Sequence, residues 1–460
     1  MTERCFTKTV IMQHDPYIIR ESTVKESPQR FLDKLKFLGP GFILSASIVG
    51  SGELIATTVL GARAGFAALW IIIISCLAKV AVQLEFGKHA ILSGETVMGA
   101  FSKLPGPKVG RYHWSVGLVF LAVLLKIVQI GGIMGGTVLV LNLIYPGFSI
   151  VVWTILITAF VAILVFNGKY NLIEKSSLVM IGMFTVLTLV SLYSLKFTVY
   201  HFSFQDVFEG LRFNLSGEIV TIAIGAFGIT GVASDEILAY HYWCLEKGYA
   251  AYTGPRNETK EWRARANGWI NIMYLDALFA MTIYTFVTVA FYLLGAAVLH
   301  KSETIPEGNQ VIETLALIYT QSLGGGIKTS YLIGAFFVLF SSLYATLAAW
   351  TRVVPDILGQ FGWFEFSDLV KRKKMIQLLA CTFPVAWALA YLFIDSPVLM
   401  VLSGGIVGSF LLLVVIYAAL HFKYKVTRFI GSSLFYNVAF WISVVSILFV
   451  AIYGLVKTFS

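Results

Sequence analysis

Two short segments place carboxylates among small residues within long apolar stretches of the chain. The segments are residues 49–56 and 232–239. The residues in or beside them that could bind an ion or solute are Gly50, Ser51, Glu53, Thr230, Ser234, Asp235 and Glu236. A charged side chain in the middle of a bilayer costs roughly 2.5–3.5 kcal/mol on insertion scales. Three such acids therefore indicate a function, and Glu53, Asp235 and Glu236 are candidate metal ligands.

The two segments also resemble each other. Valine, serine, glutamate and alanine occupy matching positions, and Leu54-Ile55 in the first corresponds to Ile237-Leu238 in the second. An odd offset of five predicted spans places the two halves of the chain in opposite orientations, as in transporters built from inverted repeats. Glycine and serine favour an unwound break in each apolar helix. Paired breaks near the middle of the membrane hold substrate in such transporters.

A purely structural role for the acids is the alternative interpretation. Glu53 and Glu236 could accept hydrogen bonds from the free amides at the start of the second half-helices. They would then stabilise the breaks without touching substrate, although capping and coordination could coexist. The sequence leaves both interpretations open.

The composition indicates a membrane protein. The chain has 460 residues, of which 58% are hydrophobic and 13% charged, whereas soluble domains carry about 25% charged residues. The net charge of +9 does not indicate nucleic-acid binding, because Lys and Arg lie in short clusters between apolar runs. The sequence contains no nucleotide-binding loop, nucleophile elbow or metal-hydrolase motif, so we expect no enzyme and no catalytic residues.

Eleven apolar runs predict a polytopic α-helical protein embedded in a lipid bilayer. They cover residues 38–60, 65–92, 113–143, 148–167, 174–195, 217–245, 268–298, 326–350, 376–394, 398–421 and 431–456. When Lys88, Lys175 and Lys328, which lie near span ends, are counted on the side that they adjoin, 26 Lys and Arg residues lie on the side of the N-terminus and 6 on the other side. This asymmetry predicts a cytoplasmic N-terminus and an outside C-terminus in the plasma (inner) membrane.

The predicted fold class is all-α, with 5+5 inverted repeats and broken first and sixth helices. We divide the chain into a cytoplasmic N-terminal segment (1–37), a first repeat with helices one to five (38–195), an extracellular linker (196–216), a second repeat with helices six to ten (217–421), and an eleventh helix with the C-terminus (422–460). None of the connecting loops is long enough for a separate soluble domain.

Other polar residues of the predicted spans are secondary candidates. Lys126 and Gln129 in the third span and His241 in the sixth could contact an anion or take part in coupling. Lys79 and Lys126 could also pair with an acid or extend toward the membrane surface. Structural roles are the stronger expectation for His241 and the two lysines.

Short motifs along nearly the whole chain resemble those of one transporter family. They are Gly39-Pro40-Gly41-Phe42, Gly52-Glu53, Gly65-Phe66, Leu69-Trp70, Gln83, the stretches 87–94 and 168–174, and Val401-Leu402-Ser403. The sequence thus resembles the Nramp (natural resistance-associated macrophage protein) family of proton-coupled divalent-metal transporters. The resemblance implies a LeuT-type fold, with helices one to five and six to ten as the inverted repeats.

The chain departs from that family at the metal site. Residues 50–53 read Gly-Ser-Gly-Glu where the family has Asp-Pro-Gly-Asn, and residues 232–234 read Val-Ala-Ser where it has Met-Pro-His. The family's metal-binding aspartate, asparagine and methionine are therefore missing. Without a thioether, oxygen ligands favour Mg²⁺, Mn²⁺ or Ca²⁺. The family's third helix carries acids, and their absence around Lys126 makes proton coupling doubtful.

Two kinds of cargo remain open. We expect a secondary transporter that moves a hard divalent cation by alternating access. The alternative is a carrier of a small anion such as bicarbonate, or of an amino acid, on the same scaffold, with H⁺ or Na⁺ as a possible coupling ion. Three carboxylates without an obvious balancing cation favour the first, and the missing metal ligands favour the second. We expect no cofactor, no nucleic-acid partner and a monomer.

Overall fold

The computed structural model describes residues 15–110, 112–166, 170–213, 217–306, 312–316 and 328–459. The predicted segments that reach residues 1–14, 167–169, 214–216, 326–327 and 460 lie outside the described residues at those positions.

The first half of the chain forms helices joined by short loops and one small β-hairpin. In order, the elements are η1 (Glu21–Thr23), α2 (Phe31–Leu35), α3 (Pro40–Ile48), η2 (Val49–Thr57), α4 (Thr58–Ala64), α5 (Leu69–Ala78), α6 (Val80–Ser93), α7 (Val97–Phe101), β1 (Lys108–Val109), β2 (Tyr112–His113), α8 (Trp114–Ile144), α9 (Ile150–Phe166), α10 (Tyr170–Ser194), η3 (Leu195–Phe197) and α11 (Phe204–Glu209). The antiparallel pair of β1 and β2 is a minor departure from the predicted all-α chain.

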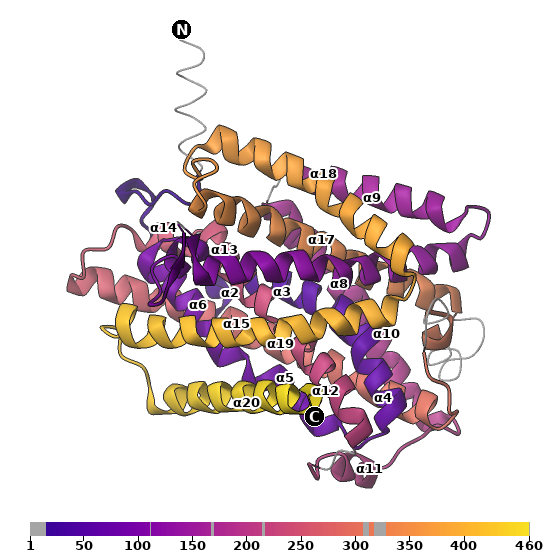
Figure 1. Ribbon diagram of the computed structural model, residues 1–460. Helices are drawn as coiled ribbons and strands as arrows, with labels where there is room; N and C mark the ends of the chain where they lie inside the picture. The colour runs from indigo at the N-terminus through magenta and orange to yellow at the C-terminus, as the bar shows by residue number, and fades with distance from the viewer. Residues whose placement is uncertain are drawn as a thin grey trace.

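The second half is helical. Its elements are α12 (Gly217–Ile229), α13 (Ser234–Lys247), α14 (Tyr249–Thr253), α15 (Lys260–Leu294), η4 (Gly295–His300), α17 (Lys328–Gln360), α18 (Leu369–Ile394), α19 (Pro397–His421), η7 (Phe422–Val426) and α20 (Leu434–Phe459). The axes of the long helices α8, α19 and α20 lie nearly parallel or antiparallel across the bundle, and α17 and α18 are inclined to them (Figure 1).

Each predicted span corresponds to an apolar helical segment. Within the described residues, nine helices are long and apolar enough to cross a membrane, and α3 with residues 53–64 forms a bent tenth span. Helix α9 has 17 residues, at the lower end of the range of roughly 17–25 for a span. Helices α15 and α18 begin seven or eight residues before the predicted boundaries, because polar turns continue them beyond their apolar parts.

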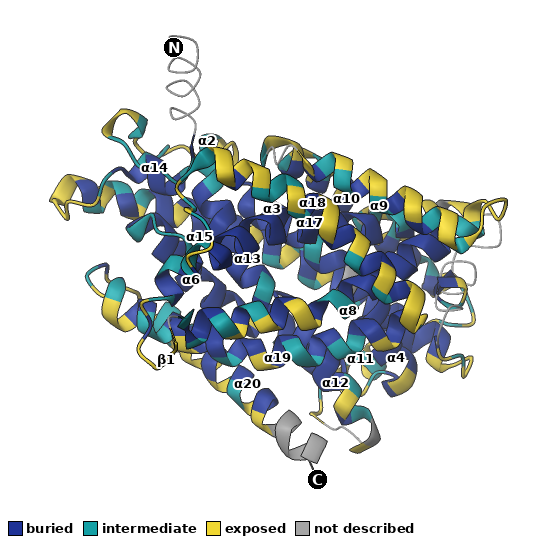
Figure 2. Cartoon of the chain, turned by 45° about the horizontal axis from the view of Figure 1, so that its top comes forward, coloured by how far each residue is buried: buried dark blue, intermediate teal, exposed yellow. Residues whose placement is uncertain are grey.

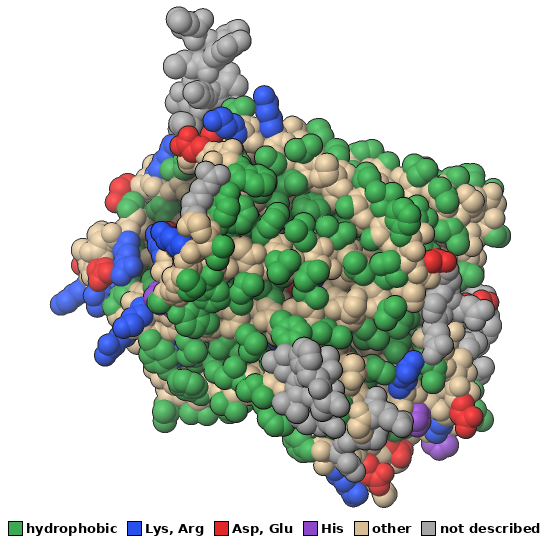
Figure 3. Space-filling view, in the orientation of Figure 1, with side chains coloured by type: hydrophobic (Ala, Val, Ile, Leu, Met, Phe, Trp, Pro, Cys, Tyr) green, Lys and Arg blue, Asp and Glu red, His purple; other side chains and the backbone are tan. Residues whose placement is uncertain are grey.

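The outer surface is apolar, as a membrane requires. Large hydrophobic side chains on the outer helices are exposed, such as Ile163 (68%) on α9 and Phe393 (84%) on α18. Figure 2 shows exposed positions along the outer faces of α9, α10 and α18, whereas α3 and α13 in the middle of the view are mostly buried. In Figure 3, hydrophobic side chains cover the middle of the face shown, and Lys and Arg gather mainly toward the end near the N-terminus. The predicted membrane fold is confirmed.

Two interrupted helices lie in the interior of the bundle. The segment η2 joins α3 to α4 and packs against α12, α15, α17 and α19. It is a π-helix rather than the unwound break that we predicted, and the two flanking parts are bent by 42°. A π-turn bends a helix while its backbone groups stay hydrogen-bonded, which explains the difference. The predicted break in the sixth span is present, since residues 230–233 separate α12 from α13.

The described part of the N-terminal segment is tied to the end of the bundle. Asp15 forms a buried ion pair with Arg372 of α18 at 2.7 Å. The Tyr17 hydroxyl donates to Glu246 of α13 at 2.7 Å. Glu246 also binds Arg352 of α17 through two hydrogen bonds of 2.9 and 3.1 Å. We call residues 15–17 the N-terminal strap, because their contacts and the Glu246–Arg352 pair link α13, α17 and α18. The sequence did not predict this feature.

Candidate functional site

Glu53 connects three parts of the bundle at the bend of the first span. Its side chain is fully buried. Its Oε1 accepts hydrogen bonds from the Gly231 amide at 3.2 Å and from the Thr288 hydroxyl at 2.7 Å. Its Oε2 accepts one from the Thr57 hydroxyl at 3.0 Å. Because Gly231 lies in the break of the sixth span and Thr288 lies in α15, Glu53 fixes both elements to η2.

Glu236 stabilises the start of the second half of the sixth span. The Ala233 amide, which precedes the first turn of α13, donates to Oε2 of Glu236 at 2.8 Å. The Ser47 hydroxyl of α3 also hydrogen-bonds to this carboxylate. Glu236 therefore accepts a hydrogen bond from an amide at the start of its own half-helix, as the capping interpretation requires. Glu53 instead accepts from the Gly231 amide, which belongs to the break of the sixth span, so the Glu53 carboxylate connects the two interruptions.

Asp235 forms an ion pair with Lys126 of α8. The lysine side chain is 1% exposed and the aspartate side chain is 20% exposed. The residual exposure arises because Asp235 lines two small cavities. The first, of about 20 Å³, is also lined by Glu236, Ser47 and Thr346. The second, of about 10 Å³, lies on the side of Lys126.

The three candidate acids do not form one metal centre in this structure. Among the described side chains, no three His, Cys, Asp or Glu residues come close enough to hold a metal ion together. Hydrogen bonds direct Glu53 toward Gly231 and Thr288, while Asp235 points toward Lys126. Asp235 and Glu236 do share a cavity. A role of the three acids in metal binding stays a prediction.

The small residues at the two interruptions pack closely. Gly50 lies against α17, where an added Cβ would lie 2.2 Å from the Val338 carbonyl oxygen. The side chain of Ser51 is outside the described part of the structure. The Thr230 hydroxyl lies 3.3 Å from the Thr57 hydroxyl. These contacts join η2 to α17 and to the break of the sixth span.

The secondary candidates have different environments. Ser234 Oγ and Gln129 Oε1 are buried and have no hydrogen-bond partner among the described residues. His241 Nε2 lies 2.7 Å from the Glu95 carbonyl oxygen. This contact supports the structural role that we expected for the histidine. The buried polar atoms of Ser234 and Gln129 are, in contrast, positions where an ion or water would be favourable.

Lys79 and Lys126 correct one of our expectations. From the sequence we identified no obvious cation to balance the three carboxylates, but in the structure Lys126 pairs directly with Asp235. Lys79 is fully buried, and its ammonium donates to the carbonyl oxygens of Phe227 and Thr230 at 2.5 and 2.6 Å. Both lysines therefore place positive charge beside the break of the sixth span. The sequence suggested an acid as a possible partner but did not indicate the carbonyl pair.

The break at residues 230–233 requires glycine at position 231. Gly231 has φ of 63°, in the left-handed region that side chains disfavour. A Cβ built there would lie 2.8 Å from Cα of Cys76 and 2.9 Å from the carbonyl oxygen of Ser75. The backbone of the break thus packs directly on α5.

Gly231→Ala is expected to lower the free energy of unfolding by about 2 kcal/mol or more, because it combines backbone strain with a clash against main-chain atoms. Thermal unfolding of the purified protein in detergent measures the change. Gly182→Ala is the matched control, because no atom lies within 4 Å of a Cβ at that glycine of α10. Equal thermal stability of the two variants would contradict the close packing at residue 231.

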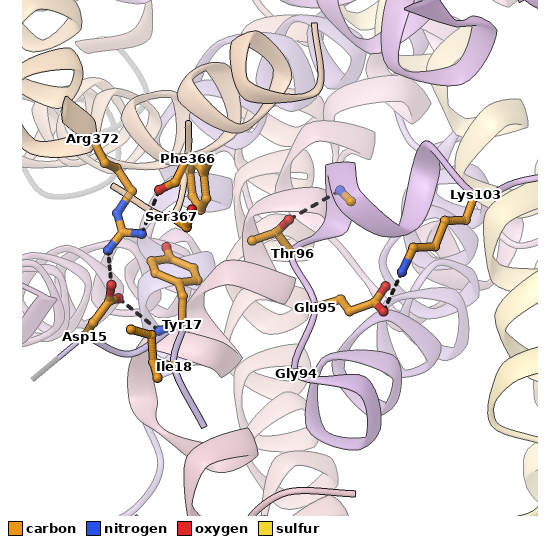
Figure 4. Close-up of a pocket in the computed structure, with 11 residues that line it drawn as sticks. Asp15, Tyr17, Ile18, Gly94, Glu95, Thr96, Lys103, Phe366, Ser367 and Arg372 are labelled. Atoms are coloured by element: carbon orange, nitrogen blue, oxygen red, sulfur yellow. Dashed lines mark hydrogen bonds and ion pairs between the residues drawn. The ribbon is translucent and has the colours of Figure 1, made fainter. Parts of the chain in front are cut away.

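A larger cavity lies beside the N-terminal strap (Figure 4), and its lining includes no residue of η2 or of the break at residues 230–233. It has a volume of about 300 Å³. Its four charged residues form two ion pairs, Asp15 with Arg372 at 2.7 Å and Glu95 with Lys103 at 2.6 Å. Since each charge already has a partner, this cavity is a weaker candidate for ion binding than the acids at the break.

Comparisons with known sequences identify related proteins. The sequence model of the Nramp family, described as natural resistance-associated macrophage protein-like, matches residues 41–457 of the chain. A divalent metal cation transporter MntH of Bradyrhizobium diazoefficiens is 22% identical over 345 residues, which are 73% of this chain and 69% of the relative. An MntH of Listeria monocytogenes is 25% identical over 280 residues, and that alignment spans 59% of this chain and 58% of the relative.

Solved structures share the fold at low sequence identity. A manganese transporter of Eremococcus coleocola (mutant E129Q) has a TM-score of 0.58 at 15% identity, covering 96% of this chain and 99% of that one. MhsT in complex with L-phenylalanine has a TM-score of 0.54 at 16% identity, covering 94% and 100%. The nucleobase-cation-symport transporter MHP1 has a TM-score of 0.54 at 14% identity, covering 94% and 92%. These similarities confirm the predicted LeuT-type fold.

Proposed function

Because the chain belongs to the Nramp family, we propose that this membrane transporter carries a small, hard divalent cation by alternating access. One observation carries the proposal: Asp235 and Glu236 line a single cavity at the start of α13. The cavity also contains Ser47 and Thr346, so oxygen is its principal ligand type. Carboxylate and hydroxyl oxygens suit Mg²⁺, Mn²⁺ and Ca²⁺, and the relatives' names include divalent metal cation and manganese transporters.

The size of the cavity favours an ion over an amino acid. Its volume of about 20 Å³ is close to the minimum of roughly 10–15 Å³ that holds one water molecule. An amino acid would require α3, α13 and α17 to separate, because Trp243 and Trp350 also line this space.

Lys126 supplies a reversible competitor for the cation in this proposal. Its ammonium binds Asp235 in the present structure. A divalent cation at Asp235 would displace the ammonium, because the two positive charges repel each other in a poorly solvated site. Return of Lys126 to Asp235 would then favour release of the cation. The exchange gives α8 and α13 two alternative contacts, as a transport cycle requires.

The distribution of basic residues supports the proposed orientation. Lys and Arg gather mainly at the end of the bundle that carries the N-terminus on the face shown in Figure 3. The positive-inside rule places such an end in the cytoplasm. We therefore propose a cytoplasmic N-terminus and an outside C-terminus.

A small anion such as bicarbonate is the second candidate cargo. The observation in its favour is that Lys126 and Lys79 place two positive charges beside the acids. Asp235 and Glu236 would repel an anion in the shared cavity, and for that reason the cation is the preferred cargo.

Uptake into liposomes containing the purified protein tests the proposal. We expect saturable uptake of at least one of Mg²⁺, Mn²⁺ and Ca²⁺, and no saturable flux of labelled bicarbonate. The double variant Asp235→Asn/Lys126→Met should lose cation uptake by about tenfold or more, because it removes a ligand that contributes at least about 1.4 kcal/mol. We change both residues because Asp235→Asn alone would leave the buried charge of Lys126 without its partner.

Glu209→Gln is the matched control, since this exposed acid of α11 lies outside the candidate site. Its uptake should equal that of the unmodified protein. Saturable bicarbonate flux without cation flux would replace the cation proposal with the anion proposal. Cation uptake that survives in the double variant would show that Asp235 is not a ligand.

A further inference from the structure

The end of α12 has the chemistry of a cation site. The last carbonyl groups of any helix lack partners within that helix, and the helix dipole makes this end negative. Helix α12 ends at Ile229, and the chain resumes helical structure only at Ser234. The carbonyl oxygens of Phe227 and Thr230 accept hydrogen bonds from a single ammonium group, so both lie within reach of one point.

The ammonium group of Lys79 occupies that point. It donates to Phe227 O at 2.5 Å and to Thr230 O at 2.6 Å, and it lies 4.7 Å from the centroid of the Phe227 ring. Two carbonyls and one aromatic face account for the three N–H groups of an ammonium ion. Lys79 is fully buried. A buried charge is tolerated when it is solvated in this way by protein groups.

The neighbouring residues hold Lys79 in this position. Lys79 lies between α5 and α6, where the regular helix is interrupted for one residue. One turn earlier, the single hydroxyl hydrogen of Ser75 is shared between the same two carbonyls, with Thr230 O at 2.8 Å and Phe227 O at 3.1 Å. Ser75 of α5 and Lys79, which follows α5, therefore both bind the free end of α12. This end lies next to Gly231, where an added Cβ would lie 2.8 Å from the Cα of Cys76.

We propose that the carbonyl end of α12 is a monovalent-cation site that Lys79 fills with a tethered ammonium. The chemical class of ligand is a small monovalent cation that prefers carbonyl oxygens, such as ammonium, methylammonium or Na⁺. With Lys79 present, the break of the sixth span needs no free cation at this point. The inference concerns this second site and does not depend on which cargo the protein carries.

Removal of the tether and addition of a free cation test this inference. Lys79→Ala leaves the Ser75 hydroxyl as the only donor to these two carbonyls among the described residues, and it opens space for a small ion. We expect the purified full-length variant in detergent to have a lower Tm than the unmodified protein. Ammonium or methylammonium should restore about half or more of the lost Tm, in a saturable manner, because a ligand that binds only the folded state stabilises it. Choline, at equal ionic strength, should have no effect because it is too large.

Two controls separate a specific site from a general salt effect. The unmodified protein should show the same Tm in ammonium, Na⁺ and choline, because Lys79 already fills the site. Ser75→Ala removes the neighbouring hydroxyl but keeps the tether, so ammonium should not stabilise it more than choline does. Stabilisation of all three proteins by ammonium to the same extent would overturn the proposal.

The inference remains testable if Lys79→Ala does not fold in ordinary buffers. Its recovery as a monodisperse protein would then be compared after extraction in ammonium, methylammonium or choline chloride. Recovery that depends on the small cations would support a cation site. Recovery that is equally poor in all three salts, or a Tm equal to that of the unmodified protein, would show that Lys79 is not a stand-in for a bound cation.

Discussion

Asp235→Asn alone is expected to lower the free energy of unfolding by about 3 kcal/mol, the lower end of the range for breaking a buried ion pair. The reason is that Lys126, with a side chain only 1% exposed, would keep its charge and lose its partner. We choose the lower end because Asp235 retains 20% exposure and the two adjoining cavities could admit a water. Unfolding in an SDS titration, followed by circular dichroism, measures the change.

The matching double variant makes this prediction specific to the pair. Asp235→Asn/Lys126→Met removes both charges and preserves much of the lysine side-chain volume. Replacing both partners of a buried ion pair with neutral groups is often neutral or stabilising. We therefore expect the double variant to be more stable than Asp235→Asn by at least about 2 kcal/mol.

Additive losses would contradict a direct interaction between the two residues. If the double variant lost as much stability as the two single variants together, Asp235 and Lys126 would act independently.

The single variant of Lys126 also tests the proposed competition between its ammonium group and the transported cation. Lys126→Met should bind the cation more tightly than the unmodified protein, because nothing competes for Asp235, and it should release the cation more slowly.

The spans were predictable because their signal is local. A span needs about 20 apolar residues in a row to cross a bilayer, and each run predicted by this rule corresponds to an apolar helical segment in the described part of the chain. The ends of α15 and α18 were missed for a related reason. Their first turns carry polar residues such as Lys260 and Lys371, and hydropathy does not report that a helix continues beyond the membrane.

The partners of the buried charges were not predictable, because they depend on contacts between distant residues. Lys126 and Asp235 are 109 residues apart in the sequence. Lys79 and the carbonyl group of Thr230 are 151 residues apart. A lysine in a span stands out because burying its charge in the membrane costs free energy. A main-chain carbonyl that accepts from it has no signature in the sequence. The second positive charge beside the break was missed for this reason.

The form of each interruption was only partly predictable. Small residues mark both segments, and at Gly231 the backbone does adopt the left-handed conformation that glycine permits. Around Gly50 the chain forms a π-helix instead. Close packing on α17 explains why glycine is needed at that position, since a Cβ would lie 2.2 Å from Val338 O. Glycine can therefore signal either a special backbone angle or a close approach, and the sequence does not distinguish them.

Glu53→Ala is expected to lower the free energy of unfolding by about 4 kcal/mol or more. The change removes the acceptor for the Gly231 amide and for the hydroxyls of Thr288 and Thr57. Leaving a buried donor unsatisfied costs about 1–3 kcal/mol for each group. This cost applies to the Gly231 amide and the Thr288 hydroxyl, because the Thr57 hydroxyl also lies 3.3 Å from the Thr230 hydroxyl. Thermal unfolding in detergent and the same SDS titration would measure the loss.

Glu53→Gln separates the structural role of this residue from a role in ion binding. The amide oxygen can accept from Gly231 and Thr288, and the amide nitrogen can donate to the Thr57 hydroxyl, which accepts as well as donates. We expect a Tm close to that of the unmodified protein and retained cation uptake, because the contacts of Glu53 require an acceptor and not a charge. Thr288→Val, which removes one of the three hydrogen bonds, should cost about 1 kcal/mol and serves as the control for a single lost contact. A Glu53→Gln protein with normal stability and no uptake would show that the structural role is not the only role of this residue, and would place the carboxylate of Glu53 on the path of the transported or coupling ion.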